Sequence, residues 1–414
     1  MAVHAVISII TPLSSAGNPF IGAAYQSLRA QTITEWEWIV LSNKGGFAPM
    51  DMRSDRRVRL VREEHDGIGR LKKRACALST SSVIVELDHD DLLAPTALSS
   101  ILDAMIMGAD FVYSDFAEFL TDSWMPNTPM RADCGWSTYP ITWDGHKLLA
   151  HRAPPVTPQN LRLIDWAPNH VRAWTRKAYE AVGGHDPAFA VGDDHDLMVR
   201  MYLAGFRFAR VPQCLYAYRV HSLNNVRTQN AAIRKATEQV YSRSIFQLAE
   251  KFAMDQGLAK VDLCGGIDCP SGYTPYDLTL GHDLNESWPI PDDSVGVLRA
   301  YDALEHLRDP IHSMSEAYRV LAPGGFFMIS VPSTDGRGAW ADPTHVSYWN
   351  SQSFRYYTDR RFSRYIPHFK GRFQLSRVID WFPSEEQKLH NLVVTEAQLF
   401  ALKPGYEPMG EVKI

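Results

Sequence analysis

The sequence predicts a two-domain α/β protein. Its 414 residues exceed what one hydrophobic core usually organises. Short apolar runs alternate with segments of helical period over residues 1–252 and again over 259–402, a pattern typical of parallel sheets with crossover helices. We expect a linker at 253–258 and a C-terminal tail at 403–414.

The expected elements of the first domain follow from these two periods. Apolar and β-branched runs predict strands at 6–10, 36–41, 58–61, 83–87, 110–113 and 214–220. Apolar residues at helical spacing predict helices at 19–31, 67–78, 94–107, 177–182, 197–204 and 227–252. Residues 121–160 show no clear period, and we expect an irregular segment there that covers an active site.

The same criteria apply to the second domain. They predict strands at 260–263, 295–300 and 326–331, a helix at 310–321, a turn at 322–325, and antiparallel strands at 373–381 and 392–402.

Composition excludes several classes of protein. A balance of 42 basic against 47 acidic side chains argues against a strongly basic nucleic-acid scaffold. The five cysteines form no C-x-x-C pair, which favours a reducing compartment over a disulfide framework or a zinc site. No segment approaches the roughly 18 apolar residues of a membrane span, and residues 1–10 read as a strand rather than a signal peptide. We therefore expect a cytoplasmic protein without a transmembrane segment.

Three carboxylates follow the predicted strand at 83–87. The run 83–87 leads into Asp88, Asp90 and Asp91. Ligands bind beyond the carboxyl ends of parallel strands, so these acids indicate a divalent metal held against a phosphate. The alternative is a cluster that caps the following helix, since acids favour that position.

Several motifs in a fixed order carry a resemblance to a known family. They are Ile9-Ile10-Thr11-Pro12, Leu87-Asp88-His89-Asp90-Asp91, Gly183-Gly184-His185-Asp186, Gly192-Asp193-Asp194-His195-Asp196-Leu197 and Tyr218-Arg219-Val220-His221. Over roughly residues 3–250 the chain resembles a family 2 glycosyltransferase of the GT-A fold, a Rossmann-like nucleotide-diphospho-sugar transferase.

The resemblance implies a nucleotide-sugar donor, with a UDP-sugar expected, and Mn²⁺ or Mg²⁺ to neutralise the leaving diphosphate. It assigns the metal to Asp90, with His221 as an imidazole ligand, although a plain surface or core histidine is the alternative for His221. The donor would contact Thr11, Pro12, Leu13, Asn43, Lys72 and Asp88. Asp91 is then left as the helix cap.

Two donor positions depart from the family's pattern. The family usually has Asp-Asp-Gly-Ser after its second strand, where this chain has Ser42-Asn43-Lys44-Gly45. The Asn43 amide both donates and accepts, so it suits a base edge, but it carries no charge and leaves the base undetermined. Lys72 stands where the family often has a phosphate-facing arginine, and a solvated lysine on a helix face is the alternative.

Asp194 aligns with the family's general base, which implies an inverting single displacement in which it deprotonates the acceptor hydroxyl. The alternative is a helix N-cap, which Asp196 would serve equally well. We expect a structural role for His195.

The second domain resembles a reduced class I S-adenosylmethionine-dependent methyltransferase. The resemblance rests on Val261-Asp262-Leu263-Cys264-Gly265-Gly266, Asp302-Ala303-Leu304-Glu305-His306-Leu307, Arg319-Val320-Leu321-Ala322-Pro323-Gly324-Gly325 and Asp342-Pro343-Thr344-His345. It makes S-adenosylmethionine a candidate cofactor, with Asp262, Gly265, Gly266, Asp277 and Asp283 as its candidate site.

The loop of this second domain argues against activity. Asp277 follows Gly266 by only eleven residues, which is too short for a full crossover helix, so we expect that helix to be missing or reduced to a turn. Glu305, His306 and His345 have the side chains of a metal site, and we expect them to be structural.

We therefore expect a metal-dependent glycosyltransferase with a methyltransferase-like second domain. One alternative is a bifunctional enzyme that glycosylates and methylates the same glycan, and another is a non-catalytic protein that binds a glycan or a partner. A glycan, a protein, a lipid-linked sugar and a modified nucleic acid all remain open as the acceptor, and the oligomeric state stays undetermined.

Overall fold

The computed structural model describes residues 5–65, 67–163, 169–224, 228–410 and 412. These residues form two compact units. Unit 1 contains the described residues up to Ala132 together with 136–244, and unit 2 contains 133–135 and the described residues from Ile245 onward. Each unit combines helices with a sheet that contains parallel and antiparallel strands, which confirms the predicted α/β fold class.

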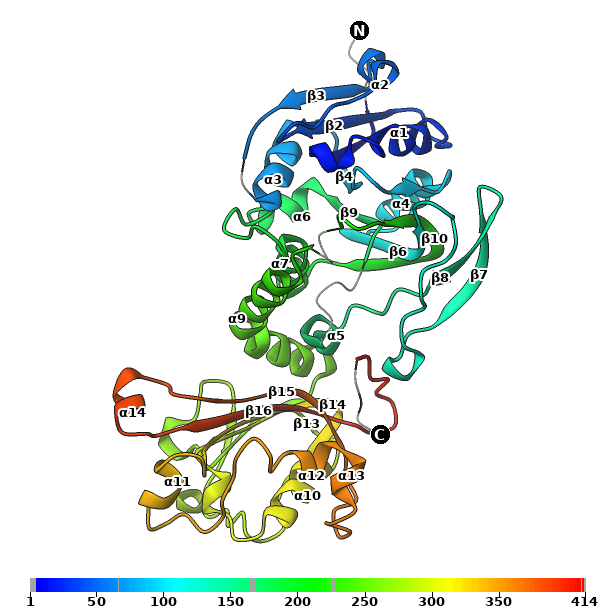
Figure 1. Ribbon diagram of the computed structural model, residues 1–414. Helices are drawn as coiled ribbons and strands as arrows, with labels where there is room; N and C mark the ends of the chain where they lie inside the picture. The colour runs from blue at the N-terminus through cyan, green and yellow to red at the C-terminus, as the bar shows by residue number, and fades with distance from the viewer. Residues whose placement is uncertain (1–4, 66, 164–168, 225–227, 411, 413–414) are drawn as a thin grey trace. The chain divides into compact units, whose positions relative to one another are not determined.

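Unit 1 is organised by a ten-stranded sheet (Figure 1). Its strands are β1 (Ile7–Leu13), β2 (Trp36–Ser42), β3 (Val58–Arg62), β4 (Val83–Glu86), β5 (Leu92–Leu93), β6 (Phe111–Leu120), β7 (Thr138–Trp143), β8 (His146–His151), β9 (Arg172–Thr175) and β10 (Phe208–Val220). The order along the sheet is β3-β2-β1-β4-β9-β6-β10-β5, with β8 joined to β6 and β7 to β8. Strands β1 to β4 are parallel, and β9 is antiparallel to both β4 and β6.

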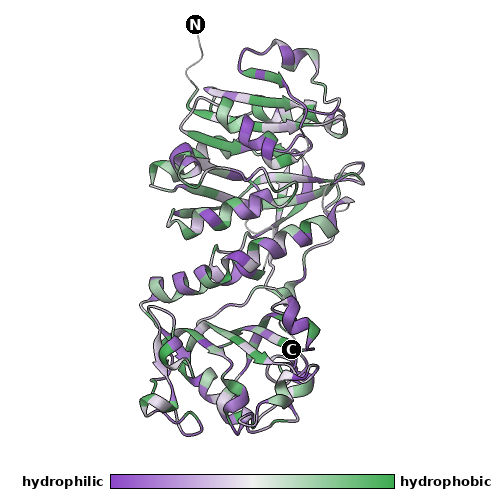
Figure 2. Ribbon diagram, turned by 90° about the vertical axis from the view of Figure 1, so that its left-hand side faces the viewer, coloured by the Kyte–Doolittle hydropathy of each residue, from purple (hydrophilic) through white to green (hydrophobic). Residues whose placement is uncertain are grey.

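Helices cover both faces of this sheet. The helices of unit 1 are α1 (Ile21–Arg29), α2 (Met50–Ser54), α3 (Ile68–Leu78), α4 (Ala97–Ile106), α5 (Pro158–Leu163), α6 (Arg176–Ala181) and α7 (Asp193–Leu203), and α9 (Asn230–Gln256) begins in this unit. Alternate strand residues face opposite ways, as the period of two requires. Trp36, Trp38 and Val40 pack with α1 and α4, whereas Ile39 and Leu41 pack with α3, α6 and α7. Figure 2 shows hydrophobic residues recurring along the strands of both sheets.

Unit 2 contains a six-stranded sheet of order β12-β11-β13-β14-β16-β15. The strands are β11 (Ala259–Leu263), β12 (Thr274–Tyr276), β13 (Val295–Tyr301), β14 (Leu321–Pro332), β15 (Phe373–Trp381) and β16 (Val394–Ala401). The helices are α10 (Pro310–Val320), α11 (Gly338–Ala341), α12 (Arg355–Thr358), α13 (Arg360–Ser363) and α14 (Glu385–Leu389). Met314, Ala317 and Val320 of α10 pack into the core of this sheet.

Two predictions for unit 2 are confirmed. The last two strands pair antiparallel. Residues 264–273, all described, contain only the 3-10 turn η3 (Gly266–Asp268) between two parallel strands, so the first crossover helix is reduced to a turn.

Three predictions about the elements were wrong. Residues 121–160 are not irregular throughout, because β7 and β8 form a hairpin there and α5 begins at Pro158. The expected turn at 322–325 lies inside β14, where the register against β13 shifts between Val295 and Val297. Helix α9 continues to Gln256, through the unit boundary and into the expected linker, and its expected start at Arg227 lies outside the described residues.

The described helices include none that is both long and apolar enough to cross a membrane. All five cysteines are described, and none is in a disulfide.

Candidate functional site

The carboxyl ends of three parallel strands meet at one edge of the sheet in unit 1. Leu13 at the end of β1 is level with Ser42 of β2, and Ile10 is level with Glu86 of β4. A cavity of about 360 Å³ at this edge is lined by residues at or just beyond these ends, among them Pro12, Leu13, Asn43, Asp88 and Asp90, and by His221, which follows β10. The strand order therefore gathers most of the predicted donor and metal residues around one space.

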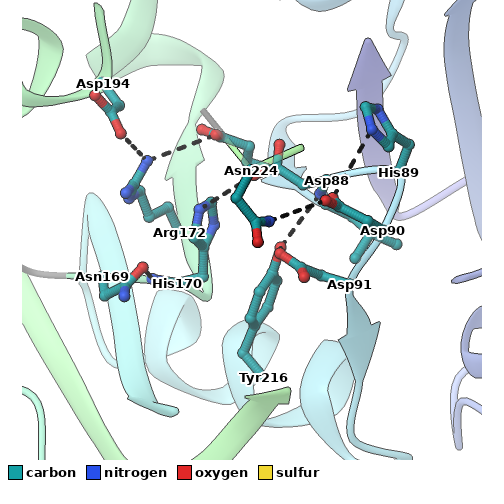
Figure 3. A network of polar contacts seen from close by, with 12 residues as sticks. Asp88, His89, Asp90, Asp91, Asn169, His170, Arg172, Asp194, Tyr216 and Asn224 are labelled. Carbon is teal, nitrogen blue, oxygen red and sulfur yellow. Dashed lines mark hydrogen bonds and ion pairs between the residues drawn. The ribbon is translucent and has the colours of Figure 1, made fainter. Parts of the chain in front are cut away.

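Asp88 lies between this cavity and a second one. The second cavity measures about 470 Å³, and its lining includes Lys72, Glu86, Arg172 and Asp194. Asp88 and Tyr218 line both cavities. Figure 3 shows Asp88 with Asp90 on one side of it and with Arg172 and Asp194 on the other. A group bound in either cavity would therefore meet the Asp88 carboxylate.

The Asp88 carboxylate is held by a buried histidine. Its Oδ2 atom lies 3.4 Å from Nε2 of His170, a ring that stacks on Tyr216 with centroids 4.6 Å apart. Burial raises the pKa of Asp88 to about 6. Burial also lowers the pKa of His170 to about 3, so the imidazole is neutral at physiological pH.

Asp90 is paired with His221. The Nε2 atom of His221 lies 2.8 Å from Oδ2 of Asp90, and Nδ1 of the same ring accepts the N–H of Leu223 at 3.2 Å. A neutral imidazole carries one proton, so these contacts assign it to Nε2, which donates to Asp90. Burial opposes ionisation of Asp90, but the His221 hydrogen bond and the electrostatic interactions with His89 and His221 together outweigh it and lower the pKa of Asp90.

Asp91 does not cap a helix, which corrects the prediction for that residue. It is fully buried, and its carboxylate accepts the Tyr216 hydroxyl at 2.8 Å and the Arg219 N–H at 2.7 Å. Helix α4 begins only at Ala97, with Thr96 as its N-cap. Asp91 therefore fastens the acidic loop to β10, the strand that precedes His221.

The side chains of two predicted donor-binding residues are already hydrogen-bonded within the protein. The Thr11 hydroxyl donates to the Leu87 carbonyl at 2.5 Å and accepts the indole N–H of Trp38 at 2.8 Å, so this buried side chain is already hydrogen-bonded within the protein. The Asn43 side chain lines the cavity, but its amide donates to the His65 carbonyl and accepts the His65 N–H at 3.1 and 3.2 Å. Asn43 therefore holds the chain after β3 in place.

Lys72 belongs to a buried charge network and not to a solvated helix face. Its Nζ atom lies 2.7 Å from Glu86 Oε1 and 3.5 Å from Asp193 Oδ2. Arg172 lies 3.6 Å from Glu86 and forms a short ion pair with Asp194. Two cations thus compensate three acids beside the second cavity, whereas the prediction placed Lys72 at the donor phosphates.

Asp194 is in the first turn of α7, which begins at Asp193 after a left-handed Gly192. The helix has no side-chain N-cap, and Asp196 is paired with Arg200 and Arg243, so the capping alternative is not observed. Burial would raise the pKa of Asp194, but the positive charges of Arg172 and Lys72 together lower it far below its usual range. Burial raises the pKa of Asp193 to about 7. His195 is fully buried against Tyr241, as expected of a structural residue.

Glu86, His170 and Arg172 were missed from the sequence. Glu86 is a single acid in an otherwise apolar strand, and buried acids require partners. Its presence in the sequence therefore indicated a buried ion pair at this strand. His170 and Arg172 reach the site because β9 pairs antiparallel with β4, with Arg172 opposite Glu86. The sequence offered no pattern that predicted this pairing.

In unit 2, four of the five predicted cofactor residues come together. Asp262 is buried and bound to Arg299 at 2.7 Å. A Cβ atom on Gly265 would lie 1.9 Å from Asp262 Oδ2, and one on Gly266 would lie 3.7 Å from the Asp277 carboxylate. Asp277 accepts the Thr279 N–H at 2.8 Å, at the start of the 3-10 turn η4 (Leu278–Leu280).

The fifth residue, Asp283, is exposed and accepts the Asn285 N–H at 2.9 Å in a separate turn. The interactions of the described residues include none between Asp283 and the other four predicted cofactor residues.

Comparisons with known proteins match both units. Residues 8–139 match the model of glycosyl transferase family 2, and residues 275–329 match that of a methyltransferase domain. An O-antigen biosynthesis protein, RfbC of Myxococcus xanthus, is 23% identical over 246 residues, which are 56% of this chain and 17% of RfbC. A probable S-adenosylmethionine-dependent methyltransferase of Mycolicibacterium smegmatis is 39% identical over 67 residues, 15% of this chain and 26% of that protein. The chain thus matches 17% of the length of RfbC and 26% of the length of the methyltransferase.

Among solved structures, S. aureus TarS 1-349 in complex with UDP-GlcNAc aligns with a TM-score of 0.44 and 13% identity, over 61% of this chain and 74% of TarS 1-349. The structure of S. aureus TarS aligns with a TM-score of 0.42 and 13% identity, over 60% of this chain and 39% of that one. The first family match includes two of the five motifs of unit 1, and the second includes two of the four motifs of unit 2. Residues 8–139 therefore match a family 2 glycosyltransferase domain, and residues 275–329 match a methyltransferase domain.

Proposed function

We propose that unit 1 transfers a sugar from a nucleotide-sugar donor to an acceptor hydroxyl, with inversion at the anomeric carbon. The observation that carries the proposal is the position of Asp88 in the wall of both cavities. A donor in the first cavity would place its reacting sugar near Asp88, and an acceptor in the second would approach the same point. Single displacement needs this arrangement, because nucleophile and leaving group occupy opposite sides of one carbon.

Asp194 is the proposed general base. It lines the second cavity, and its side chain is 24% exposed, compared with 3% for Asp193, which faces Lys72 and His185. A base must reach the hydroxyl that it deprotonates, so exposure favours Asp194. The ion pair with Arg172 keeps this carboxylate ionised and fixes its orientation.

A divalent cation, Mn²⁺ or Mg²⁺, is proposed beside Asp90. Asp88 and Asp90 would repel a donor diphosphate, and a cation would remove that repulsion by neutralising the leaving group. The Asp90 carboxylate fits such an ion as an oxygen ligand. His221 fits only in its other tautomer, because Nε2 now carries the proton and the Leu223 N–H would lose its acceptor.

The proposed donor is a UDP-sugar. The Thr11 hydroxyl is buried and the Asn43 amide is bound to His65, so we propose that the donor contacts Pro12, Leu13, Asp88 and the main chain of the loop after β2. The name of RfbC makes polysaccharide the first class of acceptor to test.

The experiment is donor hydrolysis and transfer with Mn²⁺ across the common nucleotide sugars, preceded by a thermal-shift screen of the same compounds. Binding to the native state raises stability by RT ln(1 + [L]/Kd), so the screen identifies the donor independently of the acceptor. Wild type should turn over one donor class and Asp90→Asn should not. Equal absence of turnover and of donor binding in both would reject the proposal and favour a non-catalytic binding protein.

A second candidate function is methyl transfer by unit 2 on the same product. It is favoured by the match to a methyltransferase domain and by the grouping of Asp262, Gly265, Gly266 and Asp277. The reduced first crossover opposes it, because the usual wall of the cofactor pocket is short. Calorimetric titration of the full chain with S-adenosylmethionine tests it, and heat that saturates at one equivalent would support the bifunctional alternative.

A further inference from the structure

We propose that Glu305, His306 and His345 of unit 2 bind a divalent transition-metal ion. One ligand atom from each residue lies within 4.8 Å of the other two. Ligand atoms of a tetrahedral zinc site lie roughly 3.3 Å apart, given metal–nitrogen distances of about 2.0–2.1 Å. Small side-chain rotations would therefore close the three donors around one ion.

The Glu305 carboxylate needs a partner. The residue is 2% exposed, and both carboxylate oxygens are buried without a hydrogen-bond partner in the part of the chain that the structure describes. Buried polar groups are normally hydrogen-bonded, and an unpaired buried carboxylate is costly. A cation would supply the missing interaction, whereas a purely structural role leaves both oxygens unexplained.

Both imidazoles have the tautomer that metal binding through Nε2 requires. Nδ1 of His306 lies 3.3 Å from the Thr344 carbonyl, and Nδ1 of His345 lies 3.0 Å from the Ala339 carbonyl. A carbonyl only accepts, so each Nδ1 carries the proton and each Nε2 keeps its lone pair. Metal-bound histidines typically donate the other ring N–H in this way. His221 of unit 1 has the opposite tautomer.

The backbone holds the three ligands in place. Glu305 and His306 belong to the 3-10 turn η5 (Leu304–His306). The Glu305 carbonyl accepts the N–H groups of Val346 and Ser347 at 2.8 and 3.0 Å, and the Ser347 hydroxyl donates to the Leu304 carbonyl at 2.7 Å. The segment that carries His345 is thus fixed to the turn that carries the other two ligands.

The donor set selects a class of ion. Two imidazoles and one carboxylate suit Zn²⁺ or Fe²⁺ better than Mg²⁺ or Ca²⁺, which prefer oxygen ligands. Three protein ligands also leave a coordination position for water or another ligand. This site differs from the Asp90 site of unit 1 in its residues and in its ion.

The test is equilibrium dialysis of the full-length chain with Zn²⁺, followed by the visible absorption of the Co²⁺ form. We compare wild type, Glu305→Gln, His345→Ala and the control His390→Ala, which removes an exposed imidazole of the same unit. All are made in the Asp90→Asn background, so that the proposed Asp90 site of unit 1 does not contribute. The parent and the control should bind one ion and give the Co²⁺ bands of imidazole ligation, and the other two should lose the bands with Kd at least about tenfold higher.

Thermal unfolding without metal separates binding from folding. Glu305→Gln keeps the shape of the side chain and removes a buried acid without a hydrogen-bond partner, so it should melt no lower than the parent while losing the stabilisation by Zn²⁺. If Glu305→Gln binds Zn²⁺ as tightly as the His390→Ala control, or the parent binds no ion, the proposal is overturned.

Discussion

The Nε2 atom of His221 lies 2.8 Å from the Oδ2 atom of Asp90 and carries the proton of their hydrogen bond. A ring that donates to a carboxylate has no lone pair at that nitrogen for a metal. The two residues therefore contribute unequally to the proposed cation site, since Asp90 offers an oxygen directly and His221 must first change its tautomer.

The first prediction follows from this inequality. Asp90→Asn should abolish Mn²⁺-dependent donor binding, whereas His221→Ala should raise the Kd for Mn²⁺ by no more than about tenfold. Mn²⁺ titration followed by electron paramagnetic resonance, in a Glu305→Gln background, measures both. An equal loss in the two variants would show that His221 ligates the ion in its other tautomer.

Asp194→Asn should leave donor and metal affinity nearly unchanged and slow transfer by about 10²–10⁴-fold, the usual contribution of a positioned base. Single-turnover transfer of a radiolabelled sugar measures the rate, and calorimetry measures the affinities. Asp122→Asn, a substitution of an exposed acid in the same unit, is the matched control. Transfer at the wild-type rate would remove Asp194 from the mechanism.

Lys72→Met should destabilise the protein by about 3–5 kcal/mol, because it leaves Glu86 and Asp193 as buried acids with less compensation. Urea unfolding gives the free energy, and Lys73→Met, at an exposed neighbour, should change it by less than about 0.5 kcal/mol. The double variant Lys72→Met/Glu86→Gln should recover part of the loss. A double variant no more stable than the single one would contradict the assigned pairing.

Donor binding should depend on pH through Asp88. Its pKa is raised to about 6, so cation-dependent donor affinity should fall about tenfold per pH unit below that value and level off above it. The folded state holds this proton more tightly than the unfolded state, so the stability that Asp88 contributes is present at acid pH and is lost as the pH rises through 6. Donor titrations between about pH 5 and 8, a range that includes the Asp88 pKa of about 6, measure how donor affinity depends on pH. Asp88→Asn should lack the step, and a step that persists there would assign it to another group.

The sequence predicted those parts of the site that lie at the ends of parallel strands. Pro12, Leu13, Asn43, Asp88 and Asp90 lie at or just after the ends of three such strands, and parallel strands bring their carboxyl ends to one edge whatever lies between them. The order of motifs along the chain was sufficient to place these residues together. The functions of Asp90, His221 and Asp194 stay predictions until the variants are measured.

The remainder of the site depends on tertiary pairings that local pattern does not reveal. Arg172 meets Glu86 only because β9 enters the sheet antiparallel between β4 and β6. The hairpin of β7 and β8 was predictable, because its strands join at Asp144-Gly145, both with positive φ, and Asp-Gly is a strong hairpin signal. The aromatic and charged residues around Asp144-Gly145 showed no clear period of two, so the flanking strands were not predicted.

The network of Lys72, Glu86, Asp193, Arg172 and Asp194 has a consequence for how this protein can diverge. Each cation contacts two of the acids, so the loss of one charge leaves an opposite charge buried and uncompensated. Relatives that share this packing should therefore replace Lys72 and Glu86 together or retain both, and substitution at these two positions should be correlated rather than independent.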